Sequence, residues 1–251
     1  MKVSASYLYH ALYSFRILSS KTFSIMGKNI NREEDLKNLF NKSINDIVEL
    51  PVGDNKDYYN ALSAEEFINL KKALSNINNI ITLKTTLAFV DKLAASGLID
   101  KDVVGLIKAN INSQSANANG FDILWNGDFP FIAEVKCNIP VDKNKFGPAQ
   151  LGGIYKDIIS LSQGKSKVDV NVEDYNKFMV FLHCENIYKA IDNLKGNMPK
   201  YDSYYVKGLV DDQQSLNAIW DRIVIIKSDE ITKLNKDQIG ICVIPVVAAN
   251  S

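Results

Sequence analysis

One stretch, from Gly120 to Cys137, places charged residues inside runs that otherwise have the composition of β-strands. Asp122 lies in the first apolar run, and Glu134 and Lys136 lie two residues apart in the second. Because successive side chains of a strand point to opposite faces, this spacing predicts that Glu134 and Lys136 share one face. Buried charges destabilise a sheet unless they are paired or bind a metal ion. The fold must therefore compensate these charges, and a metal ion with a phosphate ligand would do so.

The register of the expected hairpin decides whether Asp122 joins the other two charges. A two-residue turn at Asn126-Gly127 would pair Asp122 with Phe131 and put its carboxylate on the other face. An odd loop such as Asn126-Gly127-Asp128, or a bulge, would pair Asp122 with Ile132 and bring both carboxylates to one face. A shared carboxylate site therefore requires an odd or bulged turn.

Such a site has the chemistry of a hard-cation centre. Two carboxylates and a strand carbonyl are oxygen ligands suited to Mg²⁺, with Mn²⁺ as a substitute, and substrate phosphate can complete the shell. A neighbouring lysine can hold the attacking water and offset the charge that builds up in the transition state. These are the groups needed for hydrolysis of a phosphodiester bond.

The order Asp122, eleven intervening residues and Glu134-Val135-Lys136, with apolar residues before it, resembles the signature of the PD-(D/E)XK nuclease superfamily. This superfamily includes most type II restriction endonucleases and also repair and recombination nucleases. The resemblance covers about twenty residues directly, and the following helix and strand fit the αβββαβ core of the family less specifically. Phe121 stands at the loosely defined position of the name-giving proline.

The resemblance implies a role for each matched residue. Asp122 and Glu134 would be metal ligands, the Val135 carbonyl would be a further ligand, and Lys136 would be the catalytic lysine. Some members add an acid from an upstream helix, for which Glu65 is a candidate. Some also carry Gln-x-x-x-Tyr on the helix after the lysine strand. Gln150 is a candidate to line the site, although Tyr155 follows it one residue too late.

Local basic charge follows this motif in a chain whose 29 basic and 29 acidic residues balance. Zero net charge neither favours nor excludes nucleic acid, because positive charge can be confined to one cleft. Lys143 and Lys145 follow the second strand directly, so they are candidates for phosphate contacts, with solvated loop lysines as the alternative. Gly164-Lys165-Ser166 lacks the first glycine of a phosphate-binding loop, so we expect no nucleotide cofactor.

The rest of the chain predicts an α/β fold, with a central mixed β-sheet flanked by helices and a helical N-terminal part. We expect a mainly helical region over residues 1–115 and the αβββαβ core over 116–251, forming one compact unit. Helices are expected from Asn31, from Ser63 with a Ser63/Glu66 capping box, and from about Leu83 to a glycine end at Gly97. The later elements are predicted from apolar patterning: a helix over Ala149–Gln163, a buried strand over Phe178–Cys184, a helix over Ile187–Leu194, and strands over Trp220–Ile226 and Ile239–Val247.

Composition limits the remaining function classes. The three cysteines are widely spaced in apolar runs, and we find neither a secretory signal nor an apolar run of the roughly 20 residues that span a bilayer. We therefore expect a cytoplasmic protein without a membrane partner. Two distant histidines make a zinc site or a histidine-based hydrolase a poor fit.

The sequence favours a Mg²⁺-dependent endodeoxyribonuclease of the type II restriction kind, acting on double-stranded DNA. Cutting both strands of a palindromic site requires two active centres, so a homodimer is expected, with dimer or DNA contacts on the helical region. Three alternatives stay open. They are a repair or structure-specific nuclease of the same superfamily, a non-catalytic binding or interaction protein on this fold, and an unrelated α/β protein with a surface ion pair.

Overall fold

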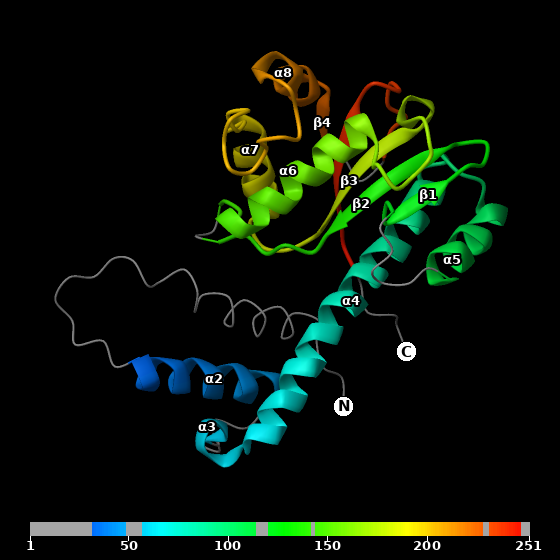
Figure 1. Ribbon diagram of the computed structural model, residues 1–251. Helices are drawn as coiled ribbons and strands as arrows, with labels where there is room; N and C mark the ends of the chain where they lie inside the picture. Colours follow the sequence, from blue (N-terminus) through cyan, green and yellow to red (C-terminus); the bar gives the residue numbers. More distant parts are fainter. Residues whose placement is uncertain (1–31, 49–56, 114–119, 142–143, 228–230, 247–251) are drawn as a thin grey trace. The chain divides into compact units, whose positions relative to one another are not determined.

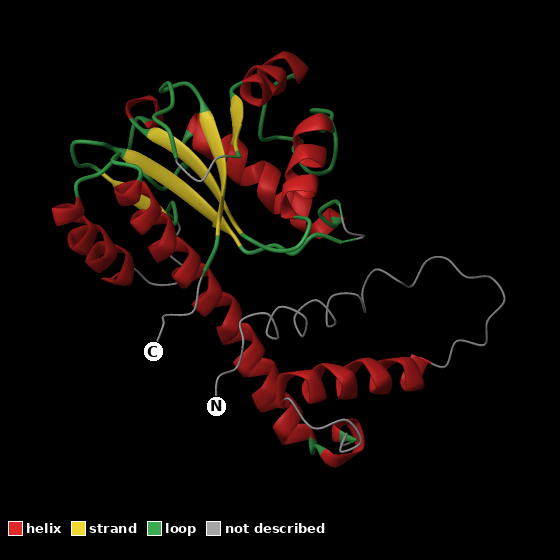
Figure 2. Cartoon of the chain, turned by 180° about the vertical axis from the view of Figure 1, so that it is seen from behind, coloured by secondary structure: helices red, strands yellow, loops and turns green. Residues whose placement is uncertain are grey.

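The computed structural model describes residues 32–48, 57–113, 120–141, 144–227 and 231–246 (Figures 1 and 2). The chain divides into two compact units, one formed by residues 1–76 with 247–251 and the other by residues 77–246. This division differs from the expected one near residue 115. Phe89, Val90 and Ile107 belong to the same hydrophobic core as the sheet, so most of the second half of the helical region folds with the strands.

The first unit contains α2 (Arg32–Val48), α3 (Tyr58–Ala61) and the beginning of α4 (Ala64–Ala95). Its apolar contact includes the rings of Phe40 and Phe67, whose centroids lie 5.2 Å apart. The expected capping box begins α4: the Ser63 N–H donates to Glu66 Oε2 at 2.7 Å, and the Glu66 N–H donates to Ser63 Oγ at 3.3 Å. The cap expected at Asn31 lies outside the described residues.

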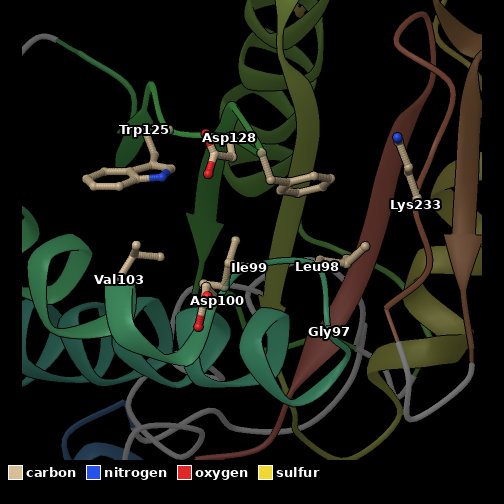
Figure 3. Close-up of a pocket in the computed structure, with 10 residues that line it drawn as sticks. Gly97, Leu98, Ile99, Asp100, Val103, Trp125, Asp128 and Lys233 are labelled. Atoms are coloured by element: carbon tan, nitrogen blue, oxygen red, sulfur yellow. The ribbon is translucent and has the colours of Figure 1, made fainter.

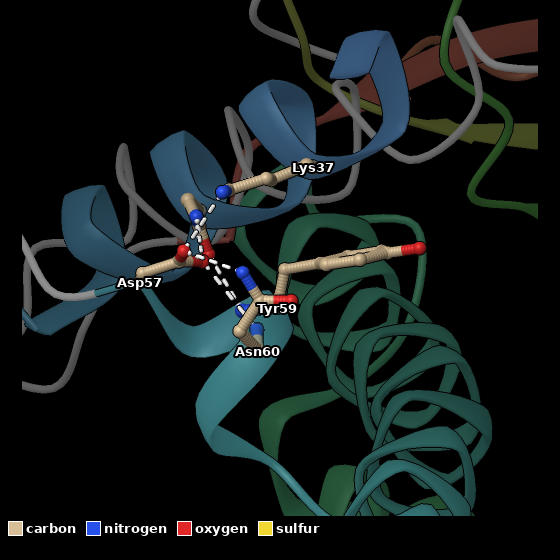
Figure 4. Close-up of polar contacts among 5 residues, drawn as sticks. Lys37, Asp57, Tyr59 and Asn60 are labelled. Atoms are coloured by element: carbon tan, nitrogen blue, oxygen red, sulfur yellow. Dashed lines mark hydrogen bonds and ion pairs between the residues drawn. The ribbon is translucent and has the colours of Figure 1, made fainter. Parts of the chain in front are cut away.

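A polar cluster around Asp57 ties α3 to α2 within this unit (Figure 4). The Asp57 carboxylate contacts Lys37 Nζ at 2.9 Å and accepts hydrogen bonds from the side-chain amides of Asn41 and Asn60. Asn41 Oδ1 in turn accepts from the Tyr59 N–H at 2.8 Å. The hydrogen bond from Asn41 and the contact with Lys37 lower the pKa of Asp57 below its ordinary value. The cluster fixes the start of a helix that is only one turn long.

The helix α4 is continuous over 32 residues, whereas the sequence predicted two helices in this region. No glycine or proline lies between Ile77 and Leu83, so the backbone has no reason to break there. The predicted end is confirmed. Gly97 adopts φ 68°, its N–H donates to the Ala94 carbonyl, and the Leu98 N–H donates to the Leu93 carbonyl, which together form a Schellman motif. The short η2 (Lys101–Val103) and α5 (Val104–Ser113) follow.

The second unit is built on a five-stranded mixed sheet, which confirms the predicted α/β class with a helical N-terminal part. The strand order is β1-β2-β3-β5-β4, and only the β1–β2 pair is antiparallel. The strands are β1 (Ile123–Trp125), β2 (Phe131–Lys136), β3 (Asn176–Leu182), β4 (Ile223–Ile226) and β5 (Ile239–Ile244). The helical elements after β2 are α6 (Pro148–Gln163), η3 (Val172–Asp174), α7 (Ile187–Gly196) and α8 (Gln213–Asp221). The helix α6 connects the parallel strands β2 and β3, which cannot be joined by a tight turn.

The two faces of the sheet carry different side chains. Phe131, Ala133 and Val135 of β2 join Phe178 and other residues in a core with α4 and α5. The intervening residues of β2 point to the opposite face, on the side where α6, α7 and α8 lie (Figure 1). Glu134 and Lys136 therefore lie on the α6 face. The sheet neighbours of these two residues on β3 are Met179 and Phe181, which are fully buried.

Two sequence-based strand boundaries near the C-terminus were wrong. Trp220 belongs to α8, and the strand begins only at Ile223. The strand β5 ends at Ile244, before Pro245, and it pairs on both sides, so Pro245 marks the end of an inner strand instead of an edge or bulge.

Between α5 and α6 the described residues form two strands, where the αβββαβ pattern has three. None of the helices in the described part of the chain has the length and apolar character needed to span a bilayer. None of the three cysteines, all of which lie in the described part of the chain, forms a disulfide.

Candidate functional site

The β1–β2 hairpin brings Asp122 and Glu134 to the same face of the sheet. Its pairs are Ile123 with Ala133 and Trp125 with Phe131, so residues 126–130 form a five-residue loop. Asp122 directly precedes β1, and continuing the register by one step places it across from Glu134. The odd loop required by the sequence is present, although it is longer than the three-residue loop considered above. Residues that face each other in a hairpin lie on the same side of the sheet, so both carboxylates point toward α6.

The Asp122 side chain connects the residue before β1 to the backbone of β2. Its Oδ2 accepts a hydrogen bond from the Val135 N–H at 2.7 Å. Burial raises the pKa of this carboxyl group above its ordinary value, and the hydrogen bond from Val135 and the charges of Lys136 and Lys165 oppose that rise only in part. Asp122 thus has a structural contact through one oxygen and an unfavourable environment for its charge.

Glu134 is the most deeply buried charged group of the cluster, with a side chain 5 % exposed. Burial raises its pKa to about 7, and repulsion from Asp157 and then Asp122 adds to the effect. The Lys165 ammonium lies 2.5 Å from Oε1 and lowers the pKa only in part. This ion pair is the contact that compensates Oε1, which is itself a buried oxygen.

Lys136 pairs with an acid that the sequence analysis did not select. Its ammonium contacts the carboxylate of Asp157 on α6, and both side chains are largely buried, at 22 % and 14 % exposure. Burial disfavours the charged ammonium, but the charges of Asp157, Glu134 and Asp122 outweigh it and raise the pKa of Lys136 above its ordinary value. Lys136 is therefore held as a cation, able to donate hydrogen bonds but not to act as a base.

Lys165 is the second residue that the sequence analysis missed. Gly164 ends α6 with φ 92°, a conformation that suits glycine. The chain leaves the helix there, and Lys165 is the next residue. Its ammonium donates to the Gly120 carbonyl at 2.7 Å and lies 5.0 Å from the centre of the Phe121 ring. Lys165 thereby connects the segment after α6 to the residues that lead into Asp122.

These five residues, Asp122, Glu134, Lys136, Asp157 and Lys165, form the site cluster. Three carboxylates and two ammonium groups give it a formal charge of −1 when all are ionised. A signal for Asp157 was present in the sequence, because it falls between Ile154 and Ile158 on the apolar stripe of α6. No comparable signal marks Lys165, whose partners lie 45 and 31 residues away along the chain.

The other candidate residues have different surroundings. Gln150 is buried, but its amide is used by the backbone: Oε1 accepts from the Gly147 N–H at 2.8 Å, and Nε2 donates to the Ile139 carbonyl at 3.1 Å. Lys145 is exposed in a loop whose backbone pairs with Val141. Lys143 lies outside the described residues. Glu65 is exposed in the first turn of α4, in the first unit.

The donor set of the cluster fits a hard divalent cation. Carboxylate oxygens of Asp122 and Glu134 share one face, and Glu134 Oε1 is a buried oxygen that already attracts one cation, the Lys165 ammonium. Val135, which follows Glu134 in β2, supplies the carbonyl proposed as a third ligand. Within the described ranges no group of three or more His, Cys, Asp or Glu side chains is arranged to hold a metal ion. Two carboxylates and a backbone carbonyl are therefore the ligands that the chain offers here.

A cavity of about 390 Å³ lies at the other end of the hairpin (Figure 3). Trp125, Phe129 and Val103 line it together with the turn that ends α4, and Asp100, Asp128 and Lys233 add charged groups. Trp125 and Phe129 pack against the core on the α4 face, whereas the site cluster lies on the α6 face. The cavity is therefore separate from the cluster.

Comparison of this chain with protein families, with curated proteins and with solved structures finds no match. The functional assignment therefore depends on the residues and their geometry.

Proposed function

We propose that this protein is a metal-dependent endodeoxyribonuclease that hydrolyses phosphodiester bonds of double-stranded DNA, and specifically a type II restriction enzyme. The observation that carries the proposal is the placement of Asp122 across from Glu134, with Lys136 two residues further along the same face. The resemblance to the PD-(D/E)XK motif selects these same three residues. The crossover from β2 through α6 to the parallel strand β3 is consistent with the later part of that core.

In this proposal Asp122, Glu134 and the Val135 carbonyl hold the metal ion, with Mg²⁺ as the expected ion and Mn²⁺ as a substitute. The bound ion supplies Lewis-acid polarisation of the phosphate and a lower pKa for a water molecule. Glu134 contributes a carboxylate that is ionised above about pH 7. Asp122 holds its own position through the Val135 N–H, so the two ligands are fixed relative to each other before substrate arrives.

Lys136 has the role of an electrostatic and hydrogen-bonding residue. Its raised pKa keeps it protonated at neutral pH, so the ammonium can orient the attacking water by donating to it and can offset negative charge on the phosphorus-bound oxygens. The water oxygen would form the new P–O bond as the bond to the leaving sugar oxygen breaks. The water proton would pass to bulk solvent, and solvent would protonate the leaving oxygen. Asp157 keeps Lys136 in position, which makes Asp157 a positioning residue.

The restriction assignment adds three expectations. The enzyme acts as a homodimer, because cleavage of both strands at a palindromic site needs two centres. It acts in the cytoplasm, where its three cysteines, which form no disulfide, remain reduced. The helical N-terminal region carries dimer contacts, DNA contacts or both, and Lys143 and Lys145 contact phosphates.

One observation favours a second candidate, a non-catalytic binding protein on the same fold. Lys136 and Glu134 each have a counter-ion within the chain, Asp157 and Lys165, so the cluster is largely neutralised without any ligand. A purely structural ion-pair network has the same arrangement.

Plasmid cleavage separates these functions. Supercoiled plasmid is incubated with the wild type in Mg²⁺, in Mn²⁺ and in EDTA, beside Lys136→Met and the control Lys156→Met, an exposed lysine on α6. We expect discrete fragments from the wild type and the control, and none from Lys136→Met or in EDTA. Cleavage without fixed fragments would select a repair or structure-specific nuclease. If no metal-dependent cleavage occurs on any DNA, the enzyme proposal is abandoned in favour of the binding protein.

A further inference from the structure

The Lys165 ammonium has the surroundings of a bound cation. It lies 2.5 Å from Glu134 Oε1 and 2.7 Å from the Gly120 carbonyl oxygen, and it faces the Phe121 ring at 5.0 Å. A carboxylate, a carbonyl and an aromatic face are all groups that attract positive charge. Two of them belong to residues 120–121, directly before Asp122. The ammonium thus connects Glu134 on β2 with the residues that lead into Asp122.

The other lysine of the cluster does not fill this role. Lys136 makes its ion pair with Asp157, so the close positive charge on Glu134 comes from Lys165. A carboxylate that is only 5 % exposed needs such a charge, because desolvation disfavours its ionised form. The contact between Lys165 and Glu134 therefore supplies the compensation that a metal ion would otherwise give.

Only one partner of this contact can move away easily. The Lys165 side chain is 20 % exposed, compared with 5 % for Glu134, and a lysine has a flexible four-carbon stem. Glu134 is fixed within β2, between β1 and β3. If a second cation binds Glu134, repulsion between like charges displaces the lysine toward solvent.

We propose that Lys165 is an internal cation that competes with the divalent metal ion for Glu134, so that metal binding requires the Lys165–Glu134 contact to open. This inference rests on the proposed function, because it takes Glu134 as a metal ligand. It adds a residue that controls the affinity for the metal and that keeps the carboxylates compensated when no metal is bound. The displaced ammonium remains next to the site, where it can pair with the phosphate of the substrate.

The sign of the change in metal affinity tests the proposal without DNA. Mg²⁺ and Mn²⁺ are titrated calorimetrically into the wild type, Lys165→Met and the control Lys167→Met, an exposed lysine two residues further along. Removing a competitor tightens binding, and we expect Lys165→Met to bind Mn²⁺ about tenfold more tightly than the wild type, a difference of about 1.4 kcal/mol. The control should bind as the wild type does. Unchanged or weaker binding by Lys165→Met overturns the proposal, since a residue that only positions the ligands would weaken binding when removed.

A second measurement uses the wild type alone, in case Lys165→Met does not fold. The folded protein is acetylated with and without saturating Mn²⁺, and the modification of each lysine is read by peptide mass spectrometry. Displacement from Glu134 predicts that Mn²⁺ increases acetylation of Lys165 and leaves Lys167 unchanged. Equal or reduced acetylation of Lys165 contradicts the proposal.

These readouts are independent of the nuclease assay. A protein that cleaves no DNA but binds Mn²⁺ more tightly as Lys165→Met loses the proposed activity and keeps this inference. A protein that cleaves DNA and shows no gain in affinity keeps the activity and loses the inference.

Discussion

Asp122 Oδ2 accepts a hydrogen bond from the Val135 N–H at 2.7 Å, so a proposed metal ligand is also a structural clamp of the hairpin. The two roles can be separated by substitution. Asparagine keeps an oxygen that can accept from Val135 and removes the charge, whereas alanine removes both.

For Asp122→Asn we expect cleavage to fall by about 100-fold or more, as for loss of a group that stabilises the transition state. Its unfolding free energy should stay near that of the wild type, because the hydrogen bond is kept. Asp122→Ala should lose activity and also about 1–3 kcal/mol of stability, because the Val135 N–H is left without its partner. Plasmid nicking and urea unfolding measure the two effects. Activity retained in Asp122→Asn rules out Asp122 as a ligand.

The raised pKa of Glu134 predicts a pH dependence of metal binding. A proton and a metal ion compete for this carboxylate, and its pKa is about 7 in the folded protein. Mn²⁺ affinity should therefore rise between pH 6 and 8, as the carboxyl group ionises. In Glu134→Gln this dependence should disappear together with most of the binding. Calorimetric titrations at several pH values provide the measurement, and a flat profile for the wild type contradicts the role of Glu134.

The same shift affects stability in the absence of metal. The folded pKa is higher than the ordinary value of 4.5, so folding favours the protonated form of Glu134. The resulting contribution to the free energy of unfolding is fully present below about pH 4.5 and is lost as the pH rises through about 7. The stability lost over this range is roughly 3 kcal/mol. Comparing the wild type with Glu134→Gln by urea unfolding at pH 5 and pH 8 isolates it, because glutamine does not titrate. The variant should gain stability relative to the wild type at pH 8.

Asp157 raises the pKa values of both Glu134 and Lys136, so its removal should change them together. In Asp157→Asn the repulsion on Glu134 is weaker, and its pKa should move from about 7 toward 4.5. Lys136 loses its ion-pair partner, and its pKa should fall. Carboxyl and lysine side-chain NMR titrations can follow both groups. A Glu134 pKa that stays near 7 would show that Asp157 does not contribute and that burial and Asp122 set it.

The sequence predicted those parts of the fold that depend on local patterns. The period of two in β2 predicted that Glu134 and Lys136 share a face, and capping chemistry predicted the start of α4 at Ser63 and its end at Gly97. The apolar pattern of the sequence did not distinguish a helix from a strand where the two have the same composition. Trp220 is buried in α8 but was assigned to a strand, because the apolar run that begins there continues directly into β4.

The site could be predicted only for the residues that carry a motif. Asp122, Glu134 and Lys136 lie within fifteen residues of one another, and the hairpin register alone brings them together. Asp157 and Lys165 reach the same place through α6 and the turn at Gly164, which position them by tertiary packing. The counter-ions of a site are therefore harder to predict than its strand residues, although an acid on an apolar helix stripe is a usable signal.

The five-residue hairpin loop contains Gly127, which packs tightly against the Trp125 indole. A Cβ atom added there would lie 2.4 Å from Trp125 Nε1 and 2.9 Å from the neighbouring ring carbon, so the Trp125 indole occupies the space of a side chain. Gly127→Ala forces the indole away from its place against the core, and we expect a loss of about 1–3 kcal/mol, as for overpacking. Gly153 in α6 is a matched control, because nothing lies within 4 Å of an added Cβ.

Gly153→Ala should increase stability by about 0.5–1 kcal/mol, since alanine loses less backbone entropy in a helix. The two glycine substitutions therefore have opposite expected signs in urea unfolding. Tryptophan fluorescence adds a local readout: Gly127→Ala should shift the emission to longer wavelength as Trp125 becomes more exposed, while Trp220 stays buried. Equal stability of Gly127→Ala and the wild type would mean that the indole moves freely.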